Sequence, residues 1–404
     1  MCRNGFLFGL LLLLSSNIAC PQSGSISGIV TDSVSGYPVA NLSVFFPFTT
    51  IGTTTNAKGE YVLDRLPPGD YTLMFRHVSY QTYSVPITIE AGKQKVMNLA
   101  AAISNYNIDE VVKTGGRVDF RWGYDLFKRY FLGDPGEVNC ILKNPDDLKF
   151  YYDGHEITAF AKKPLIIVNR HLGYRITFFL DYFRFVENNR SGISTVVGSY
   201  YAFSGSALYE DLAPSALLNA FKWRNTREAE FTGSLKHFLA CLYNDKLIEN
   251  RYTVRKVYKE IDEIQKEEKI GLAMAKVRYA MMDSVFFWNP ESSVIEFLNY
   301  FPDDEYRIGL EKIRETPGSG IKTLTVAPSI IIFRDLGKTK DLKDDWTFSI
   351  QLPDSVIEFD REGNYGVPTG EFIKTDLNNS ARIRVLLPLD YLSADQKAPI
   401  ARTP

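Results

Sequence analysis

The stretch from Gly28 to Thr82 constrains the fold of this chain more than any other. Within it, short apolar runs alternate with turn signals at close intervals, a pattern typical of small all-β units. Ser35-Gly36, residues 56–59 and Pro67-Pro68-Gly69 supply the backbone angles of tight turns. We therefore predict six strands between these turns, at Ser27–Thr31, Leu42–Phe46, Gly52–Thr55, Tyr61–Leu63, Gly69–Phe75 and Gln81–Val85.

Four short motifs in this stretch carry a resemblance to a known family. They are Gly28-x-Val30-x-Asp32, Pro38-Val39 with Val44, the run TNAKGEY at 55–61 and the run LPPGDY at 66–71. The stretch resembles the carboxypeptidase regulatory-like domain, which is a transthyretin-like β-sandwich of seven strands. The resemblance implies such a sandwich over residues 24–102. It implies no chemistry, because a fold does not determine a function.

The first twenty residues read as an export signal. Arg3 precedes the apolar run from Phe6 to Leu14, and polar residues follow it. Two outcomes remain open. The leader is cleaved near Ala19 and the chain is released, or Ile18-Ala19-Cys20 serves as a lipobox-like motif and Cys20 is acylated. We expect an exported protein of the periplasm or the outer membrane. No later run is apolar and long enough for a transmembrane helix.

The composition is that of a globular, β-rich protein. The chain has 404 residues and a formal net charge of −2, which gives no reason to expect a nucleic-acid partner. Its 23 Tyr and 27 Phe suit half-buried sheet faces, although aromatic surfaces that stack on glycans are an alternative use.

Residues 103–118 read as a linker that ends at Gly115-Gly116. Within it, Ile108, Asp109, Glu110, Val111 and Val112 resemble the TonB-box segment that follows the same module in outer-membrane nutrient receptors. The resemblance implies pairing with a periplasmic energy-transducing partner by strand addition. The alternative is a plain linker or a strand of the next domain.

Residues 119–404 are predicted to form a larger α+β domain that is rich in strands, with one or two helices. Apolar residues at helical spacing predict helices at Phe120–Leu132 and Thr226–Ile248. Predicted strands lie first at Val138–Leu142, Leu148–Tyr152, Glu156–Ala161, Leu165–Val168, Tyr174–Phe185 and Thr195–Phe203. Later strands are predicted at Leu272–Tyr279, Ser284–Phe287, Tyr306–Ile308, Leu324–Phe333, Trp346–Leu352, Ser355–Phe359 and Ile383–Leu387.

Several stretches of this second part carry another resemblance. They include His171-Leu172-Gly173-Tyr174, residues 223–227, residues 232–239, Asp360–Tyr365 and Leu386–Tyr391. Together they are similar to a family of envelope proteins that contain a carboxypeptidase-like regulatory domain. Gly370-Glu371-Phe372 replaces an aromatic Gly-Tyr-Trp element of that family. This resemblance implies no activity.

No motif in the sequence predicts catalysis. The four histidines lie in different segments without metal-ligand spacing, and no nucleophile elbow or phosphate loop occurs. We therefore assign no catalytic, cofactor-binding or metal-binding residue and expect no cofactor. Asp360–Asn364 could hold calcium, but a hairpin turn is the better interpretation. Cys140 and Cys241 either pair or remain buried thiols.

These observations favour a non-enzymatic envelope protein, in which the sandwich is a scaffold and the larger domain binds an envelope protein or a glycan. One alternative is a hydrolase of unrecognised type that acts on a glycan or envelope polymer. Another is an accessory to TonB-coupled uptake, which follows from the segment Ile108–Val112.

Overall fold

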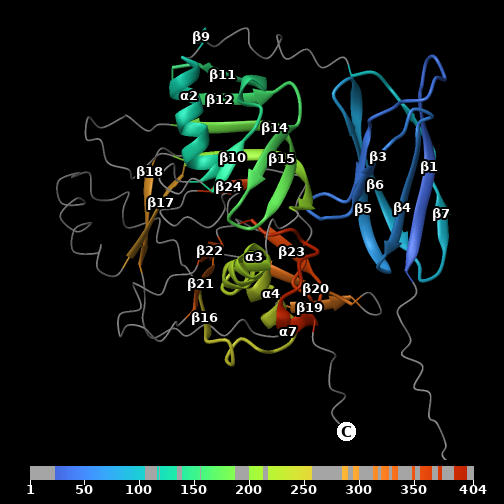
Figure 1. Cartoon of the computed structure of the whole chain (residues 1–404). Helices are drawn as coiled ribbons and strands as arrows, with labels where there is room; N and C mark the ends of the chain where they lie inside the picture. The colour runs from blue at the N-terminus through green and yellow to red at the C-terminus, as the bar shows by residue number, and fades with distance from the viewer. Residues whose placement is uncertain are drawn as a thin grey trace, which may run out of the picture. The chain divides into compact units, whose positions relative to one another are not determined.

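The computed structural model describes residues 23–104, 116–117, 119–133, 139–154, 156–186, 200–212 and 217–256, and short segments after them. Those segments are 284–289, 294–299, 313–316, 320–326, 330–334, 348–350, 355–365, 372–374 and 386–397. The chain divides into two compact units. The first comprises residues 1–46 and 52–104, and the second comprises 47–51 and 105–404. The described part is mostly strands, as predicted (Figure 1).

The first unit is a sandwich of two sheets. One sheet has the order β4-β1-β7, with β8 also on β1, and the other has the order β3-β2-β5-β6. The strands are β1 (Gly24–Asp32), β2 (Ser43–Phe45), β3 (Gly52–Thr54), β4 (Glu60–Leu66), β5 (Gly69–His77), β6 (Tyr80–Ile89), β7 (Gln94–Val96) and β8 (Leu99–Ala101). All six predicted strands of this region are confirmed.

Strands β7 and β8 together act as the seventh strand of the sandwich. Both run parallel to β1, in successive registers that begin at Ser25 and at Val30. Met97 and Asn98 interrupt them, and the Asn98 side chain accepts a hydrogen bond from the Ile29 N–H at 2.9 Å. The Asn98 side chain therefore takes the place of a backbone ladder bond at the interruption.

Residues of the family motifs hold the turns of this sandwich. The Asp32 carboxylate accepts hydrogen bonds from the N–H groups of Val34 and Ser35 and from the Ser35 hydroxyl. Asn56 Oδ1 accepts from the N–H groups of Lys58 and Glu60. Such side-chain bonds mimic backbone turns. These residues of the motifs therefore stabilise the turns of the sandwich.

A large antiparallel sheet is the centre of the second unit. Its order is β10-β13-β14-β12-β11-β9, and β15 pairs with both β14 and β24. The strands are β9 (Gly116–Arg117), β10 (Cys140–Leu142), β11 (Leu148–Tyr152), β12 (Glu156–Ala161), β13 (Leu165–Asn169), β14 (Tyr174–Val186), β15 (Tyr200–Asp211) and β24 (Phe372–Lys374). The prediction is confirmed for β10 to β14. Of the strand predicted at Thr195–Phe203, residues 200–203 begin β15, which continues to Asp211, and residues 195–199 lie outside the described residues.

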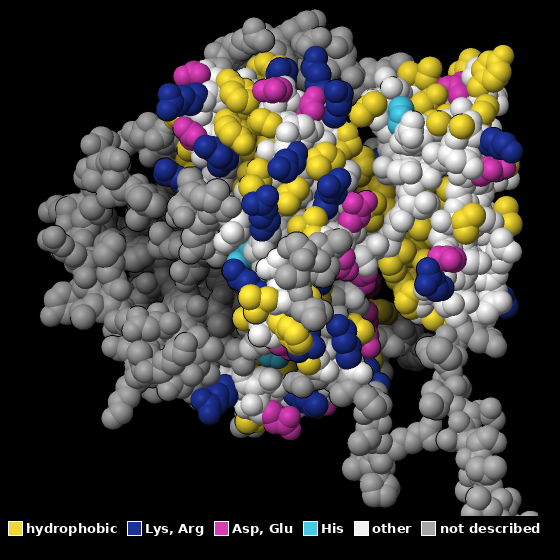
Figure 2. Space-filling model, in the orientation of Figure 1, with side chains coloured by type: hydrophobic (Ala, Val, Ile, Leu, Met, Phe, Trp, Pro, Cys, Tyr) yellow, Lys and Arg dark blue, Asp and Glu magenta, His cyan; other side chains and the backbone are white. Residues whose placement is uncertain are grey.

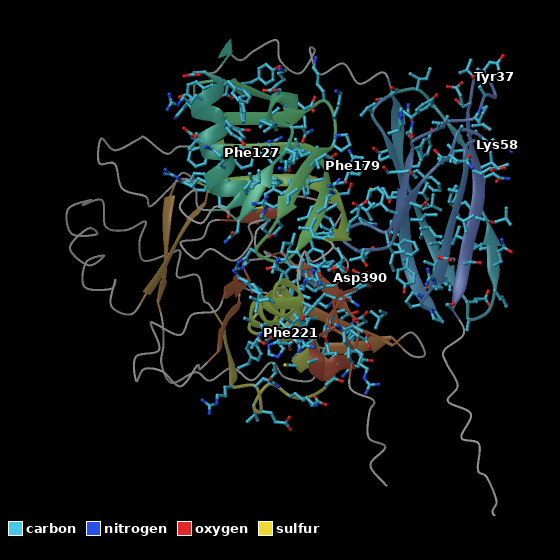
Figure 3. The ribbon with its side chains drawn as sticks, in the orientation of Figure 1. Tyr37, Lys58, Phe127, Phe179, Phe221 and Asp390 are labelled. Atoms are coloured by element: carbon cyan, nitrogen blue, oxygen red, sulfur yellow. The ribbon has the colours of Figure 1, made fainter. Side chains whose placement is uncertain are left out.

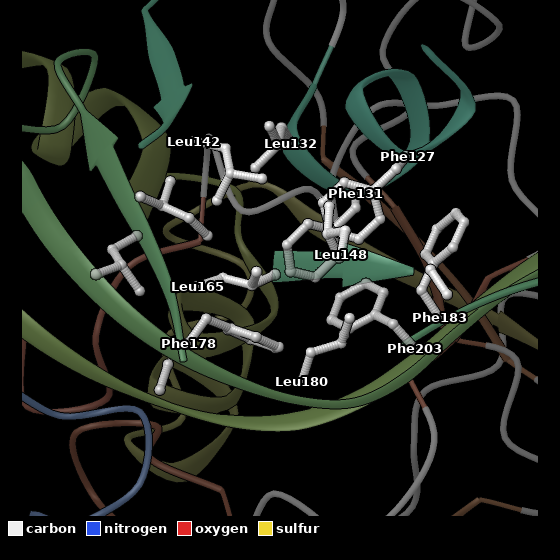
Figure 4. Close-up of a cluster of buried hydrophobic side chains, with 14 of the residues drawn as sticks. Phe127, Phe131, Leu132, Leu142, Leu148, Leu165, Phe178, Leu180, Phe183 and Phe203 are labelled. Carbon is white, nitrogen blue, oxygen red and sulfur yellow. The ribbon is translucent and has the colours of Figure 1, made fainter. Parts of the chain in front are cut away.

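Phenylalanine rings fill the core beneath this sheet. Helix α2 (Phe120–Phe127) begins at Asp119, whose side chain accepts from the Arg121 N–H, and it continues into a π-helical turn, η1 (Lys128–Leu132). Phe131 of that turn is fully buried, and its ring centroid lies 5.0 Å from those of Phe178 and Phe203 (Figure 4). The predicted helix at 120–132 is thus confirmed, and its apolar face covers the sheet.

Five residues from the β2–β3 connection belong to this second core. Phe48 is buried, and its N–H donates to the Ala207 carbonyl oxygen at 2.7 Å. The Phe48 carbonyl accepts from the Leu389 N–H at 2.7 Å. Residues 47–51 are therefore part of the second unit, although they lie between two strands of the first in sequence.

The single helix predicted at Thr226–Ile248 is wrong. Two helices occupy this region, α3 (Leu217–Phe231) and α4 (Leu235–Tyr243). Gly233 has a φ of 94°, which ends one helix, and the Ser234 hydroxyl accepts from the His237 N–H and begins the next. The prediction missed this break because the apolar stripe of the sequence continues across it.

Smaller sheets complete the described part of the second unit. Their strands are β16 (Tyr252–Lys256), β17 (Ser284–Asn289), β18 (Val294–Asn299), β19 (Ile313–Thr316), β20 (Ile321–Val326), β21 (Ile330–Arg334), β22 (Phe348–Ile350) and β23 (Ser355–Phe359), followed by a short helix, α7 (Ala394–Lys397). The single strand predicted at Leu324–Phe333 is wrong, because β20 and β21 belong to different sheets.

Two further outcomes concern the later strands. Of Ile383–Leu387, the described residues Leu386 and Leu387 are irregular and pack on the large core, so that prediction is wrong there. The predicted strands at Leu272–Tyr279 and Tyr306–Ile308 lie outside the described residues.

Candidate functional site

The site residues predicted from the sequence differ from the polar side chains that the structure brings together. Cys20 and the segment Ile108, Asp109, Glu110, Val111 and Val112 all lie outside the described residues. The structure instead brings together the β13–β14 turn, helices α3 and α4, the loop after β23 and the segment 386–397. We call this group of polar side chains the helix cluster, and its members are Asp211, Arg227, Glu228, Glu230, Lys236, His171, Tyr174, Asp360 and Tyr391.

Lys236 of α4 is the buried cation of the helix cluster. Only 6% of the residue is exposed, and its ammonium group donates hydrogen bonds to the carbonyl oxygens of Leu389 and, at 2.6 Å, Tyr391. Burial lowers the pKa of Lys236 to about 8, and the nearby carboxylates of Asp360, Asp390 and Glu362 oppose that change. The side chain thus ties α4 to the segment 386–397.

Glu228 of α3 binds the same segment. One of its carboxylate oxygens accepts from the Tyr391 hydroxyl at 3.0 Å and from the Ala394 N–H at 3.1 Å. Burial, followed by the bond to this carboxylate, raises the pKa of Tyr391 above its ordinary value. Tyr391 therefore keeps its proton and remains a donor throughout the physiological range.

Arg227, the residue before Glu228, holds α3 on the large sheet. Its Nε donates to the Leu172 carbonyl at 2.6 Å, and its Nη2 donates to the Gly173 carbonyl at 3.0 Å and to the Asp211 carboxylate at 2.7 Å. The guanidinium carbon also lies 3.8 Å from the centroid of the Tyr174 ring. One side chain thus joins the turn and the end of β15.

His171 forms an ion-pair geometry with the last turn of α3. Its Nε2 lies 2.7 Å from Glu230 Oε1, and both side chains are about a quarter exposed. The turn itself is held by Asn169, whose side chain accepts from the N–H groups of His171 and Leu172. The His171 side chain therefore contacts a carboxylate on α3, which the sequence did not indicate.

The His237 side chain binds the backbone at the break between α3 and α4. Its Nδ1 accepts from the Gly233 N–H at 3.1 Å and lies 2.7 Å from the Tyr252 hydroxyl. It therefore stabilises the break between α3 and α4.

The loop at Asp360–Asn364 is a hairpin turn. The Asp360 carboxylate accepts from the N–H groups of Glu362 and Asn364 and from the Asn364 side-chain amide. Within the described ranges, no group of three or more His, Cys, Asp or Glu side chains is placed to hold a metal ion. Both carboxylate oxygens of Asp360 thus accept hydrogen bonds from the turn itself.

Asp390 anchors the loop at 47–51 (Figure 3). Both of its carboxylate oxygens accept from the Thr50 N–H at 3.0 Å, and one accepts from the Thr50 hydroxyl. Nearby, the Tyr209 hydroxyl is fully buried and has no hydrogen-bond partner among the described residues. Burial raises the pKa of Tyr209 well above its ordinary value, so this hydroxyl is not an acid or base near neutral pH.

The two described cysteines lie in separate cores and do not form a disulfide. Cys140 packs against the large core, whereas Cys241 is buried in the cluster around α4. Burial raises the pKa of Cys140 to about 12, so the thiol stays protonated and is a weak nucleophile. The structure therefore agrees with the alternative that Cys140 and Cys241 remain thiols and do not pair.

The helix cluster is suited to holding elements together. The charged groups of Lys236, Arg227 and Glu228 each contact backbone or side-chain partners within the unit. The stretches that carry the second resemblance, at 171–174, 223–227, 232–239 and 386–391, converge here. The sequence analysis did not predict a role for Lys236. Its position between Leu235 and Phe238, in an apolar stripe, could have indicated a buried lysine.

The two-sheet unit with these turn residues defines a protein that carries a carboxypeptidase regulatory-like domain. Residues 26–113 match the family described as CarboxypepD_reg-like domain. Among curated proteins, the TonB-dependent receptor P39 of Formosa agariphila is 31% identical over 118 residues, which are 28% of this chain and 10% of that protein.

The TonB-dependent transporter Oar of Myxococcus xanthus is 36% identical over 76 residues, which are 18% of this chain and 7% of that protein. The matches thus span about a tenth or less of either relative. Among solved structures, the minor pilin GBS52 of Streptococcus agalactiae is 15% identical and has a TM-score of 0.19, with 22% of this chain and 47% of that chain covered. That score is too low to indicate a shared fold for the whole chain.

Proposed function

We propose that this chain is an exported, non-enzymatic protein of the outer-membrane-associated cell envelope, with a binding or accessory role. The observation that carries the proposal is the CarboxypepD_reg-like domain at 26–113, together with similarity to two proteins named as TonB-dependent. The helix cluster supports it, because its charged groups bind neighbouring segments of the unit.

In this proposal the sandwich is a scaffold and the second part of the chain binds an envelope protein or a glycan. The proposed organisation is a leader at 1–20, the sandwich at 24–102, a linker at 103–118 and the second domain at 119–404. Residues 47–51 are an exception to these bounds. They lie within the range 24–102 but belong to the second compact unit. Among the described residues, no helix is long and apolar enough to cross a membrane.

Cell fractionation tests the proposed location. The chain is produced from its own leader with a C-terminal tag, and outer membranes, periplasm and cytoplasm are separated and probed. We expect the tag with the outer membranes or the periplasm. A matched variant with Leu11→Arg and Leu12→Arg in the leader should remain in the cytoplasm. Recovery of the parent chain from the cytoplasm would refute the proposal.

A second candidate function, an accessory role in TonB-coupled uptake, is favoured by one observation. The match to the domain continues to residue 113 and so includes Ile108–Val112. A synthetic peptide of residues 105–116 should bind the periplasmic domain of a TonB-type protein from the same cell. A control peptide with Ile108, Val111 and Val112 replaced by serine should not bind. Equal binding of the two peptides, or no binding of either, would discard this candidate.

A further inference from the structure

Helix α3 has an exposed face that carries two large apolar side chains. Leu218 and Phe221, one helical turn apart, are 77% and 53% exposed. Figure 3 labels Phe221 on α3, and Figure 2 shows hydrophobic atoms in that place with Lys and Arg side chains beside them. In the described part of the chain, 16 Phe, Leu and Ile residues are 0% exposed. The exposure of Leu218 and Phe221 therefore raises the question of what contacts this face.

The charged residues around these two side chains are basic. Lys222 and Arg224 are exposed on the same helix, and Arg224 lies over the Phe221 ring at 5.4 Å. Arg170, in the β13–β14 turn, is also exposed, and its carbonyl oxygen accepts a hydrogen bond from the Trp223 indole of α3 at 2.9 Å. Apolar side chains bordered by cations are the pattern of a helix that lies in a membrane interface.

The two acidic residues of α3 have partners within the second unit. Glu228 binds Tyr391 and the Ala394 N–H, and Glu230 binds His171. The nearby Asp211 carboxylate is paired with Arg227. Both carboxylates of α3 are thus held by partners within the unit, whereas the exposed Lys222 and Arg224 supply positive charge beside Leu218 and Phe221.

We propose that this face of α3 docks on a membrane surface rich in anionic lipid headgroups. Leu218 and Phe221 enter the boundary between headgroups and acyl chains, and Lys222 and Arg224 contact the anionic groups. This docking goes beyond the proposed accessory role and does not require acylation of Cys20. Because the apolar area is small, it is a reversible contact that a second anchor would strengthen.

Vesicle co-sedimentation tests the docking. The exported full chain carries Cys20→Ser, so that no acyl chain contributes, and it is mixed with vesicles of equal parts phosphatidylglycerol and phosphatidylethanolamine, or with phosphatidylcholine alone. We expect at least fivefold more binding to the anionic vesicles, with loss of most of it in 0.5 M salt. Equal binding to both vesicles, or binding to neither, would overturn the proposal.

Variants identify the surface. Leu218→Ser with Phe221→Ser should lower binding at least fivefold, and Lys222→Glu with Arg224→Glu should abolish the preference for anionic lipid. The matched control is Val34→Ser with Tyr37→Ser, which removes two exposed apolar side chains, 88% and 75% exposed, from the first unit. It should bind as the parent does. Unchanged binding by the α3 variants, or an equal loss in the control, would overturn the assignment to α3.

A spectroscopic readout separates docking from nonspecific adsorption. Phe221→Trp should show a blue-shifted emission and quenching by brominated acyl chains with anionic vesicles. Tyr37→Trp should show neither. Quenching of both, or of neither, would contradict insertion of the α3 face.

Discussion

The ammonium nitrogen of Lys236 lies 2.6 Å from the carbonyl oxygen of Tyr391, a residue 155 positions later in the chain. The same ammonium also binds the Leu389 carbonyl. A buried cation therefore satisfies two backbone acceptors of an irregular segment. Glu228 binds that segment from α3, so two helices hold it through side chains.

Replacement of Lys236 by methionine should destabilise the second unit. The methionine fills much of the volume but leaves the carbonyl oxygens of Leu389 and Tyr391 without a donor, which costs about 1–3 kcal/mol. Urea unfolding followed by tryptophan fluorescence measures this, because all four tryptophans, at 122, 223, 288 and 346, lie in the second unit. Unchanged unfolding would show that the lysine does not support the segment.

The stability of the second unit should rise with pH between about 8 and 10. The pKa of Lys236 is lowered from 10.5 to about 8 in the folded chain, so in this window the unfolded chain binds more protons. The free energy of unfolding then increases by on the order of 1 kcal/mol per pH unit. Below pH 8 the contribution of Lys236 to this free energy does not change with pH. Unfolding of Lys236→Met at the same pH values is the control, and it should lack this slope. A parent whose stability falls over this window relative to the variant would contradict the assignment.

Gly363→Ala should destabilise the contact between the Asp360–Asn364 turn and α4. An added Cβ would lie 2.1 Å from the Lys236 carbonyl oxygen, at a residue whose φ is +78°. We expect a loss above about 3 kcal/mol, since the backbone strain alone costs about 1–3. Gly320→Ala is the matched control, because its φ is +66° and a Cβ there meets nothing within 4 Å. Equal losses in the two variants would show that the close approach to α4 does not matter.

Arg227→Lys should also cost about 1–3 kcal/mol despite the retained charge. Lysine cannot reproduce the planar fork that reaches Leu172, Gly173 and Asp211 together. Arg224→Lys, at an exposed position of the same helix, should change the stability by less than about 0.5 kcal/mol. Urea unfolding of both variants compares them, and similar effects would contradict the role given to Arg227.

How much of the fold could be predicted depends on local signals. The sandwich strands followed from closely spaced turns, and the strand at Tyr174–Val186 followed from partial alternation. The break between α3 and α4 depends on Gly233 and Ser234. Both lie inside a continuous apolar stripe, and the stripe led to the prediction of a single helix. The split between β20 and β21 was missed for the same reason, because an uninterrupted apolar run reads as one strand.

The site was less predictable than the fold. Thr50 and Asp390 are 340 residues apart in sequence, and no local pattern indicates their contact. The same holds for Lys236 and Tyr391. The residues that the sequence did favour, Cys20 and Ile108–Val112, lie outside the described residues and stay predictions.

Mass spectrometry of the natural protein's N-terminus tests export to the envelope most directly. The protein is isolated from cells of its own species and digested, and the first peptide is identified. We predict a chain that starts after Ala19 or shortly beyond, or at Cys20 with acyl chains attached. A chain recovered with Met1 and the whole apolar run still in place would contradict the account.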